Sequence, residues 1–114
     1  MSASTVATMG ALSYEFPDLL PLLQEHLEDN EGEMLPHLYL ADVMRWLAKR
    51  ATAREDLCRA ILRWLEDAYA TGNEEIRGLL TVSGVELIPD PGEPGSELRT
   101  LLGPRLRSID PWPT

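Results

Sequence analysis

The sequence has only one cysteine, Cys58, among its 114 residues. A single thiol excludes an intrachain disulfide and a cysteine-rich zinc site, and it favours a reducing compartment. Charged residues also interrupt every apolar run before the roughly 18 residues that a membrane-spanning helix requires. Residues 1–12 contain no Lys or Arg and no continuous apolar stretch, so they lack the pattern of a secretory leader. We expect a soluble cytoplasmic protein with a buried, inert thiol and a flexible tail over residues 1–12.

Basic residues are scarce and unevenly placed. Ten Lys and Arg stand against nineteen Asp and Glu, which gives a formal net charge of −9. Residues 1–44 carry eight acids and no Lys or Arg, residues 45–65 carry a net +4, and residues 66–98 carry a net −7. This surplus of negative charge opposes binding to nucleic acid or to an anionic membrane. It favours a protein partner with a basic surface.

The apolar residues that are present follow a helical spacing. They make up 44% of the chain, which is enough for one core. The spacing predicts helices over residues 16–29, 35–50, 54–70, 74–87 and 96–109, with a Pro- and Gly-rich loop over residues 89–95. A strand over residues 82–88 is the alternative to the end of the fourth helix. We also expect Pro36 in the first turn of the second helix, Asn73 as the N-cap of the fourth, and a bend or break at Gly103 and Pro104 in the last.

These segments define one expected domain over residues 13–109, followed by a tail over residues 110–114. The second predicted helix is apolar over most of its circumference, which is typical of a central, buried helix. The sequence therefore predicts an all-α fold, either a single small bundle or a short helical solenoid of four to five helices.

No motif for metal, cofactor or catalysis is complete. His26 and His37 lie eleven residues apart, and neither has a second ligand at metal-binding spacing. Aligning Gly32 with the glycine of a calcium loop places Leu27 and Leu38 at positions that need oxygen ligands. We therefore predict no metal, no cofactor and no catalytic residue.

Asp42 is the most informative single residue, because it lies between Ala41 and Val43 in the most apolar helix. An unpaired buried carboxylate is costly. One interpretation is an ion pair with Arg45 or with an arginine of the next helix. The other is that Asp42 emerges at the edge of a groove and receives a basic side chain from a partner.

The candidate partner-binding residues are acids of the two negative segments together with tyrosines. Acidic side chains attract a basic partner, and Tyr and Trp are enriched at interfaces. We expect contacts from Glu28, Asp29, Glu31, Glu33, Asp42, Glu66, Asp67, Glu74, Glu75, Tyr14 and Tyr39. Trp112 is a third candidate for an exposed aromatic anchor.

Three stretches together resemble a known group of proteins. They are LPHLYLADVMRWL at residues 35–47, ILRWLEDAYATGNEEIRGLLTVSGVE at residues 61–86 and LRTLLGPRLR at residues 98–107. Over residues 16–107 the chain is similar to a family of small, acidic, uncharacterised bacterial helical proteins associated with polymorphic-toxin immunity. The resemblance implies an immunity protein that neutralises a cognate toxin by direct contact, and it transfers no active-site residue.

Two other functions remain open at this point. The same acidic surfaces suit an adaptor or scaffold domain in a larger bacterial complex. A small enzyme is the third possibility, with titratable groups assembled from distant positions such as His37, Asp42 and Glu86.

Overall fold

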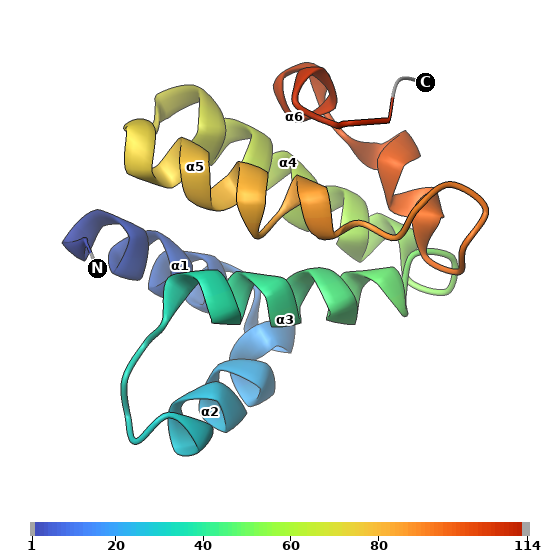
Figure 1. The fold of residues 1–114 in the computed structure, drawn as a ribbon. Helices are drawn as coiled ribbons and strands as arrows, with labels where there is room; N and C mark the ends of the chain where they lie inside the picture. Colours follow the sequence, from blue (N-terminus) through green and yellow to red (C-terminus); the bar gives the residue numbers. More distant parts are fainter. Residues whose placement is uncertain (1, 113–114) are drawn as a thin grey trace.

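The computed structural model describes residues 2–112, which fold into helices joined by short turns (Figure 1). No strand occurs within this range, so the predicted all-α class is confirmed and the alternative strand over residues 82–88 is wrong. The elements are α1 (Ala3–Glu15), η1 (Pro17–Leu19), α2 (Leu20–Asp29), α3 (Pro36–Ala48), α4 (Glu55–Thr71), α5 (Glu74–Val82), η2 (Val85–Leu87), η3 (Ser96–Leu101) and α6 (Pro104–Ser108), where η denotes a 3-10 helix.

The prediction of a flexible tail over residues 1–12 is wrong within the described residues, because α1 begins at Ala3. The Ser2 side chain accepts a hydrogen bond from the Thr5 amide (3.2 Å), as an N-cap does. Met9 and Leu12, three residues apart, are fully buried in the core. This helix raises the number of α-helices among residues 2–112 to six, above the expected four to five.

Two of the predicted helices are broken by local backbone chemistry. The segment 16–29 forms a 3-10 turn before α2, which places Pro21 in the first turn of a new helix, where its missing amide removes no hydrogen bond. The predicted helix 74–87 ends at Val82. The chain then turns into η2 at Gly84. This turn requires glycine, because a Cβ at position 84 would lie 2.3 Å from the Leu80 carbonyl oxygen.

The last segment is also divided. The predicted break at Gly103 and Pro104 is confirmed, because α6 begins at Pro104. Asn73 caps α5 as its position predicts, by accepting a hydrogen bond from the Ile76 amide (2.9 Å).

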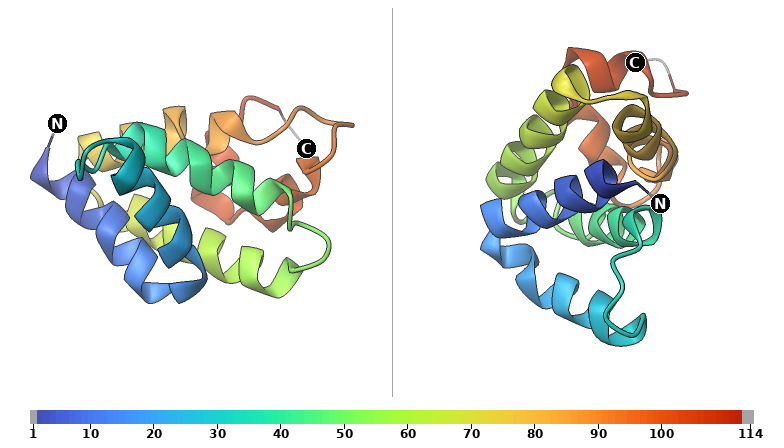
Figure 2. Two further views of the ribbon diagram at one scale, coloured as in Figure 1. Left: turned by 90° about the horizontal axis from the view of Figure 1, so that it is seen from below. Right: turned by 90° about the vertical axis from the view of Figure 1, so that its left-hand side faces the viewer.

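The central element is α3, as its apolar circumference predicts. Its side chains Tyr39, Leu40, Val43 and Leu47 are fully buried, and α1, α2, α5 and η3 all pack against it (Figure 1). In the right-hand view of Figure 2, α4, α1 and α2 form one side of the molecule. None of the helices in residues 2–112 combines the length and apolarity needed to cross a bilayer.

A buried ion pair fixes the C-terminal segment. Arg99 Nε lies 3.1 Å from Asp110 Oδ2, and both side chains are at least nine-tenths buried. The same guanidinium donates hydrogen bonds to the carbonyls of Ile88 and Pro89. The expected tail over residues 110–114 thus begins with an anchored carboxylate, and its residues 113–114 lie outside the described range.

Candidate partner-binding site

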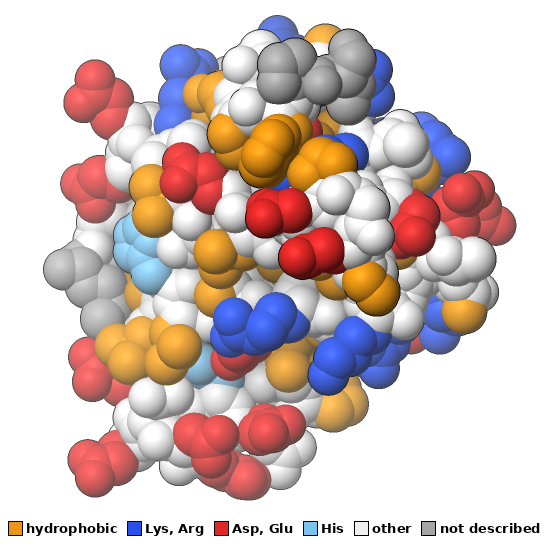
Figure 3. All heavy atoms as spheres, turned by 45° about the vertical axis from the view of Figure 1, so that its right-hand side comes forward, with side chains coloured by type: hydrophobic (Ala, Val, Ile, Leu, Met, Phe, Trp, Pro, Cys, Tyr) orange, Lys and Arg blue, Asp and Glu red, His pale blue; other side chains and the backbone are white. Residues whose placement is uncertain are grey.

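Five exposed carboxylates form a ridge along α2 and the loop that follows it, Glu25, Glu28, Asp29, Glu31 and Glu33. In Figure 3, acidic side chains gather at the lower end of the molecule, below a band of Lys and Arg. No ion pair joins any of the five to a base within residues 2–112. We call this set the acidic ridge, and its full negative charge faces solvent.

The backbone that carries the ridge is held by a helix-terminating motif. The Gly32 amide donates to the Leu27 carbonyl (2.7 Å), the long hydrogen bond that closes a Schellman motif after α2. In this motif the residue after the C-cap adopts left-handed backbone angles, and that residue is Glu31, with φ of 56°. Glycine usually occupies this position, because any Cβ is strained there.

His26 fixes the other end of the loop from beneath. Its Nε2 accepts a hydrogen bond from the Leu35 amide (3.0 Å), and the Asn30 side chain donates to the His26 carbonyl (2.8 Å). The ring is buried and lies against Tyr39, with 5.3 Å between ring centroids. His26 therefore acts as a packing residue that holds the acidic loop in one conformation.

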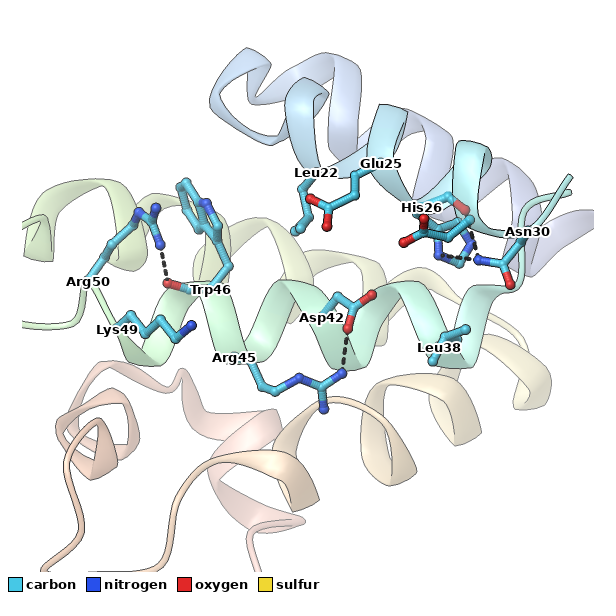
Figure 4. Close-up of a pocket in the computed structure, with 11 residues that line it drawn as sticks. Leu22, Glu25, His26, Asn30, Leu38, Asp42, Arg45, Trp46, Lys49 and Arg50 are labelled. Carbon is cyan, nitrogen blue, oxygen red and sulfur yellow. Dashed lines mark hydrogen bonds and ion pairs between the residues drawn. The ribbon is translucent and has the colours of Figure 1, made fainter. Parts of the chain in front are cut away.

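A groove of about 570 Å³ runs between α2 and α3 beside the ridge (Figure 4). Glu25 and Asp29 lie on its α2 wall. The α3 wall carries Arg45 and Lys49, so the two walls differ in charge. Leu22, Leu38 and Trp46 supply the apolar lining.

Asp42 lies in this groove and forms an ion pair with Arg45, one turn further along α3 (Figure 4). The predicted pairing is confirmed. The side chain is 33% exposed, so it also lies at the edge of a groove, which is the position that the alternative interpretation requires.

The basic wall includes an arrangement that sequence reasoning missed. The guanidinium of Arg50 stacks over the Trp46 ring, 4.0 Å from its centroid, and donates to the Trp46 carbonyl (3.0 Å). The spacing of four residues was the available signal, although Arg50 lies in the turn just beyond the end of α3. The pair lies at one end of the groove. Of the basic groups on the α3 side of the groove, Lys49 forms no ion pair within the described residues.

Tyr39 is not an exposed anchor, and the prediction that it contacts a partner is wrong. The side chain is fully buried, and its hydroxyl donates to Ser13 Oγ (2.6 Å), since that oxygen already donates to the Met9 carbonyl. Burial is the main cause that raises the pKa of Tyr39; the hydrogen bond with Ser13 opposes this rise, and the charge of Asp42 adds a smaller raising effect. Tyr14 and Trp112 are exposed, as predicted.

Glu66 is also misassigned by the sequence. The carboxylate is 7% exposed and accepts hydrogen bonds from the amides of Arg105 and Leu106, both at 3.0 Å. It caps the N-terminus of α6, and a Cβ at Gly103 would lie 2.7 Å from it. Glu66 is therefore a structural residue and cannot face a partner.

The remaining predicted acids, Asp67, Glu74 and Glu75, are exposed on α4 and α5. In Figure 1, α5 lies in the upper part of the molecule and α2 at the bottom, so these acids form a second group apart from the ridge.

Two of the three groups proposed for an enzyme, His37 and Asp42, have separate partners, and the third, Glu86, is exposed. His37 Nδ1 hydrogen-bonds to Ser83 Oγ (2.6 Å), whereas Asp42 is paired with Arg45. Among residues 2–112, no three His, Cys, Asp or Glu side chains are placed to hold a metal ion. The Cys58 thiol is buried as predicted, and that burial raises its pKa against the lowering effect of Arg50 and Arg54.

The fold and this site define a small all-α protein with a fixed acidic ridge beside a groove of mixed charge. The family described as "Domain of unknown function (DUF7674)" matches residues 9–109, and the chain belongs to this family. Searches of curated proteins and of solved structures found no match.

Proposed function

We propose that this chain is an immunity-type binding protein, which neutralises a cognate bacterial toxin by direct contact through the acidic ridge. The ridge offers five exposed carboxylates without internal ion pairs, so a basic surface can approach it without breaking an existing ion pair. Opposite charge of this kind accelerates encounter between proteins.

The observation that carries the proposal is the position of Glu31. A left-handed residue with a side chain costs about 1 kcal/mol relative to glycine, and strain of this kind concentrates at functional sites. The carboxylate stands on a loop that the Schellman motif and His26 both fix. A charge held in a strained, fixed position is typical of a binding surface that already has its bound conformation before the partner arrives.

The groove beside the ridge completes the proposed binding surface. Its apolar lining of Leu22, Leu38 and Trp46 can receive an aromatic or aliphatic anchor from the toxin. The ammonium group of Lys49 on the opposite wall would favour an acidic residue next to that anchor. Contact at two oppositely charged walls would set the orientation of the toxin.

The first experiment identifies the partner and then measures its rate of association. The chain is purified from its source cells, and co-purifying proteins are identified by mass spectrometry. Association with the identified toxin domain is then followed against ionic strength for the parent and for a ridge variant carrying Glu28→Lys, Asp29→Lys, Glu31→Lys and Glu33→Lys. We expect the parent rate to fall with salt and the variant to be slow at all salt concentrations.

A variant with Glu74→Lys, Glu75→Lys, Glu86→Lys and Glu93→Lys reverses the same number of exposed acids and is the control for charge reversal away from the ridge. Equal slowing of both variants would indicate a general effect of net charge and would contradict a ridge-specific contact. A co-purifying partner without toxic activity would instead favour the adaptor function.

Glu31→Gly separates stability from binding at a single residue. The substitution should raise the free energy of unfolding by about 0.5–1 kcal/mol by relieving the left-handed strain, and it should slow association with the toxin. Glu33→Gly removes the same charge at an ordinary backbone position, so it should lower stability by about 0.5–1 kcal/mol. Urea unfolding and association rates measure both effects. If Glu31→Gly is more stable and binds equally fast, Glu31 has no role in binding.

A further inference from the structure

The solvent-facing side of α1 carries no charge over almost its whole length, although the chain has a net charge of −9. Ala7, Ala11 and Tyr14 lie at i, i+4 and i+7 on one stripe of this helix, and all three are exposed. Tyr14 is 73% exposed, the largest value among the exposed large hydrophobic residues of the described chain. An exposed aromatic on an uncharged helix face is typical of an interaction surface.

This stripe borders a groove of about 540 Å³ between α1 and α4. Ala7 and Ala11 line one wall, and Trp64 and Ala68 line the other, with Ile76 at one end. Trp64 is only partly buried by the core and lines the groove. In the right-hand view of Figure 2, α1 and α4 lie on one side of the molecule with no helix outside them.

The charges beside this groove are self-complementary. Arg63 and Asp67 are exposed and lie one turn apart on α4, and neither forms an ion pair within residues 2–112. Two α4 helices that meet antiparallel across a two-fold axis would place each Arg63 opposite Asp67 of the other copy. A symmetric contact therefore satisfies both charges twice.

We propose that the occupant of this face is a second copy of the same chain. In the resulting two-fold dimer, the exposed Tyr14 of each copy packs into the α1–α4 groove of the other, and two Arg63–Asp67 pairs flank the contact. The acidic ridge on α2 would repel a second copy, whereas the α1–α4 face combines an uncharged stripe on α1 with one exposed arginine and one exposed aspartate on α4.

Sedimentation equilibrium of the full chain, over micromolar to millimolar concentration, tests the proposal. The parent mass should rise from 12.7 kDa toward twice that value. Ala11→Glu places a charge at the centre of the face on an exposed helical position, so it should leave the chain folded and monomeric. Ala53→Glu, at an exposed position outside the groove, is the matched control and should dimerise like the parent.

A charge-swap cycle tests the two-fold arrangement. Arg63→Asp and Asp67→Arg should each weaken dimerisation by about tenfold or more, because symmetry repeats every repulsion twice. The double variant should restore it. Arg54→Asp changes an arginine that pairs with Asp18 inside the chain (3.4 Å), nine residues before Arg63, and should have no effect on dimerisation.

Three results would overturn the proposal. They are a parent that stays monomeric at all concentrations, a dimer that Ala11→Glu does not disrupt, and a double variant that fails to recover. Circular dichroism of each variant ensures that a lost dimer is not a lost fold. Because the acidic ridge is not involved, these results leave the proposed toxin-binding function unaffected.

Discussion

The cap that Glu66 places on α6 leads to a quantitative prediction about stability. Glu66→Ala removes two hydrogen bonds to a carboxylate and leaves the amides of Arg105 and Leu106 without their acceptor. Hydrogen bonds to charged groups contribute about 1.5–3 kcal/mol each, and removing a cap costs about 0.5–2 kcal/mol. Because the two bonds share one carboxylate and water can reach Arg105, we expect a total loss of about 2–4 kcal/mol.

The assay is equilibrium unfolding in urea, followed by far-ultraviolet circular dichroism. Glu66→Gln keeps one acceptor oxygen but places the side-chain amide NH2 against a backbone N–H donor. It should therefore lower the free energy of unfolding by about half as much as Glu66→Ala. Glu28→Gln is the matched control on an exposed acid, and it should change stability by less than about 0.5 kcal/mol. If Glu66→Ala unfolds at the parent's urea concentration, Glu66 is not a cap and returns to the set of partner-binding candidates.

Two further predictions concern buried polar contacts. Tyr39 has a raised pKa in the fold, so its contribution to stability is complete below its unfolded pKa of 10.0 and falls as the pH rises through the folded value. Tyr39→Phe should cost about 1 kcal/mol at neutral pH and should reduce the loss of stability at alkaline pH. Urea unfolding at a series of pH values measures both effects. Arg99→Met should cost about 3–5 kcal/mol, because it leaves Asp110 buried without its cation. Combining Arg99→Met with Asp110→Leu should recover most of this loss. If Arg99→Met alone were as stable as the parent, this would contradict the burial of the pair.

Local signals allowed much of the fold to be predicted from the sequence. The N-cap at Asn73, the first-turn proline at Pro36 and the break at Gly103 each act on neighbouring residues, and each is observed. The α1 helix was missed because it has almost no charged residues, so its exposed and buried faces do not contrast in polarity.

The residues that sequence reasoning misplaced depend on partners far along the chain. Tyr39 meets Ser13 across 26 residues, and Glu66 meets Leu106 across 40. A carboxylate or a hydroxyl that is buried by such a contact has the same local pattern as an exposed one. Four of the five ridge acids, Glu28, Asp29, Glu31 and Glu33, are exposed as predicted, because nothing distant covers them. Glu25 was not among the predicted residues, and the left-handed strain at Glu31 appears only in the backbone angles.

The placement of α1 has a consequence for the synthesis of the protein. The Asn73 side chain donates a hydrogen bond to Ser4 Oγ across 69 residues, and α1 packs against α5. The ribosome synthesises α1 first and α5 much later. At about 5–20 residues per second, α1 waits roughly 3 to 14 seconds for this contact. During that interval its apolar side chains Met9 and Leu12 have no α5 to cover them. The nascent chain therefore passes through a stage in which a chaperone or premature self-association competes with correct folding.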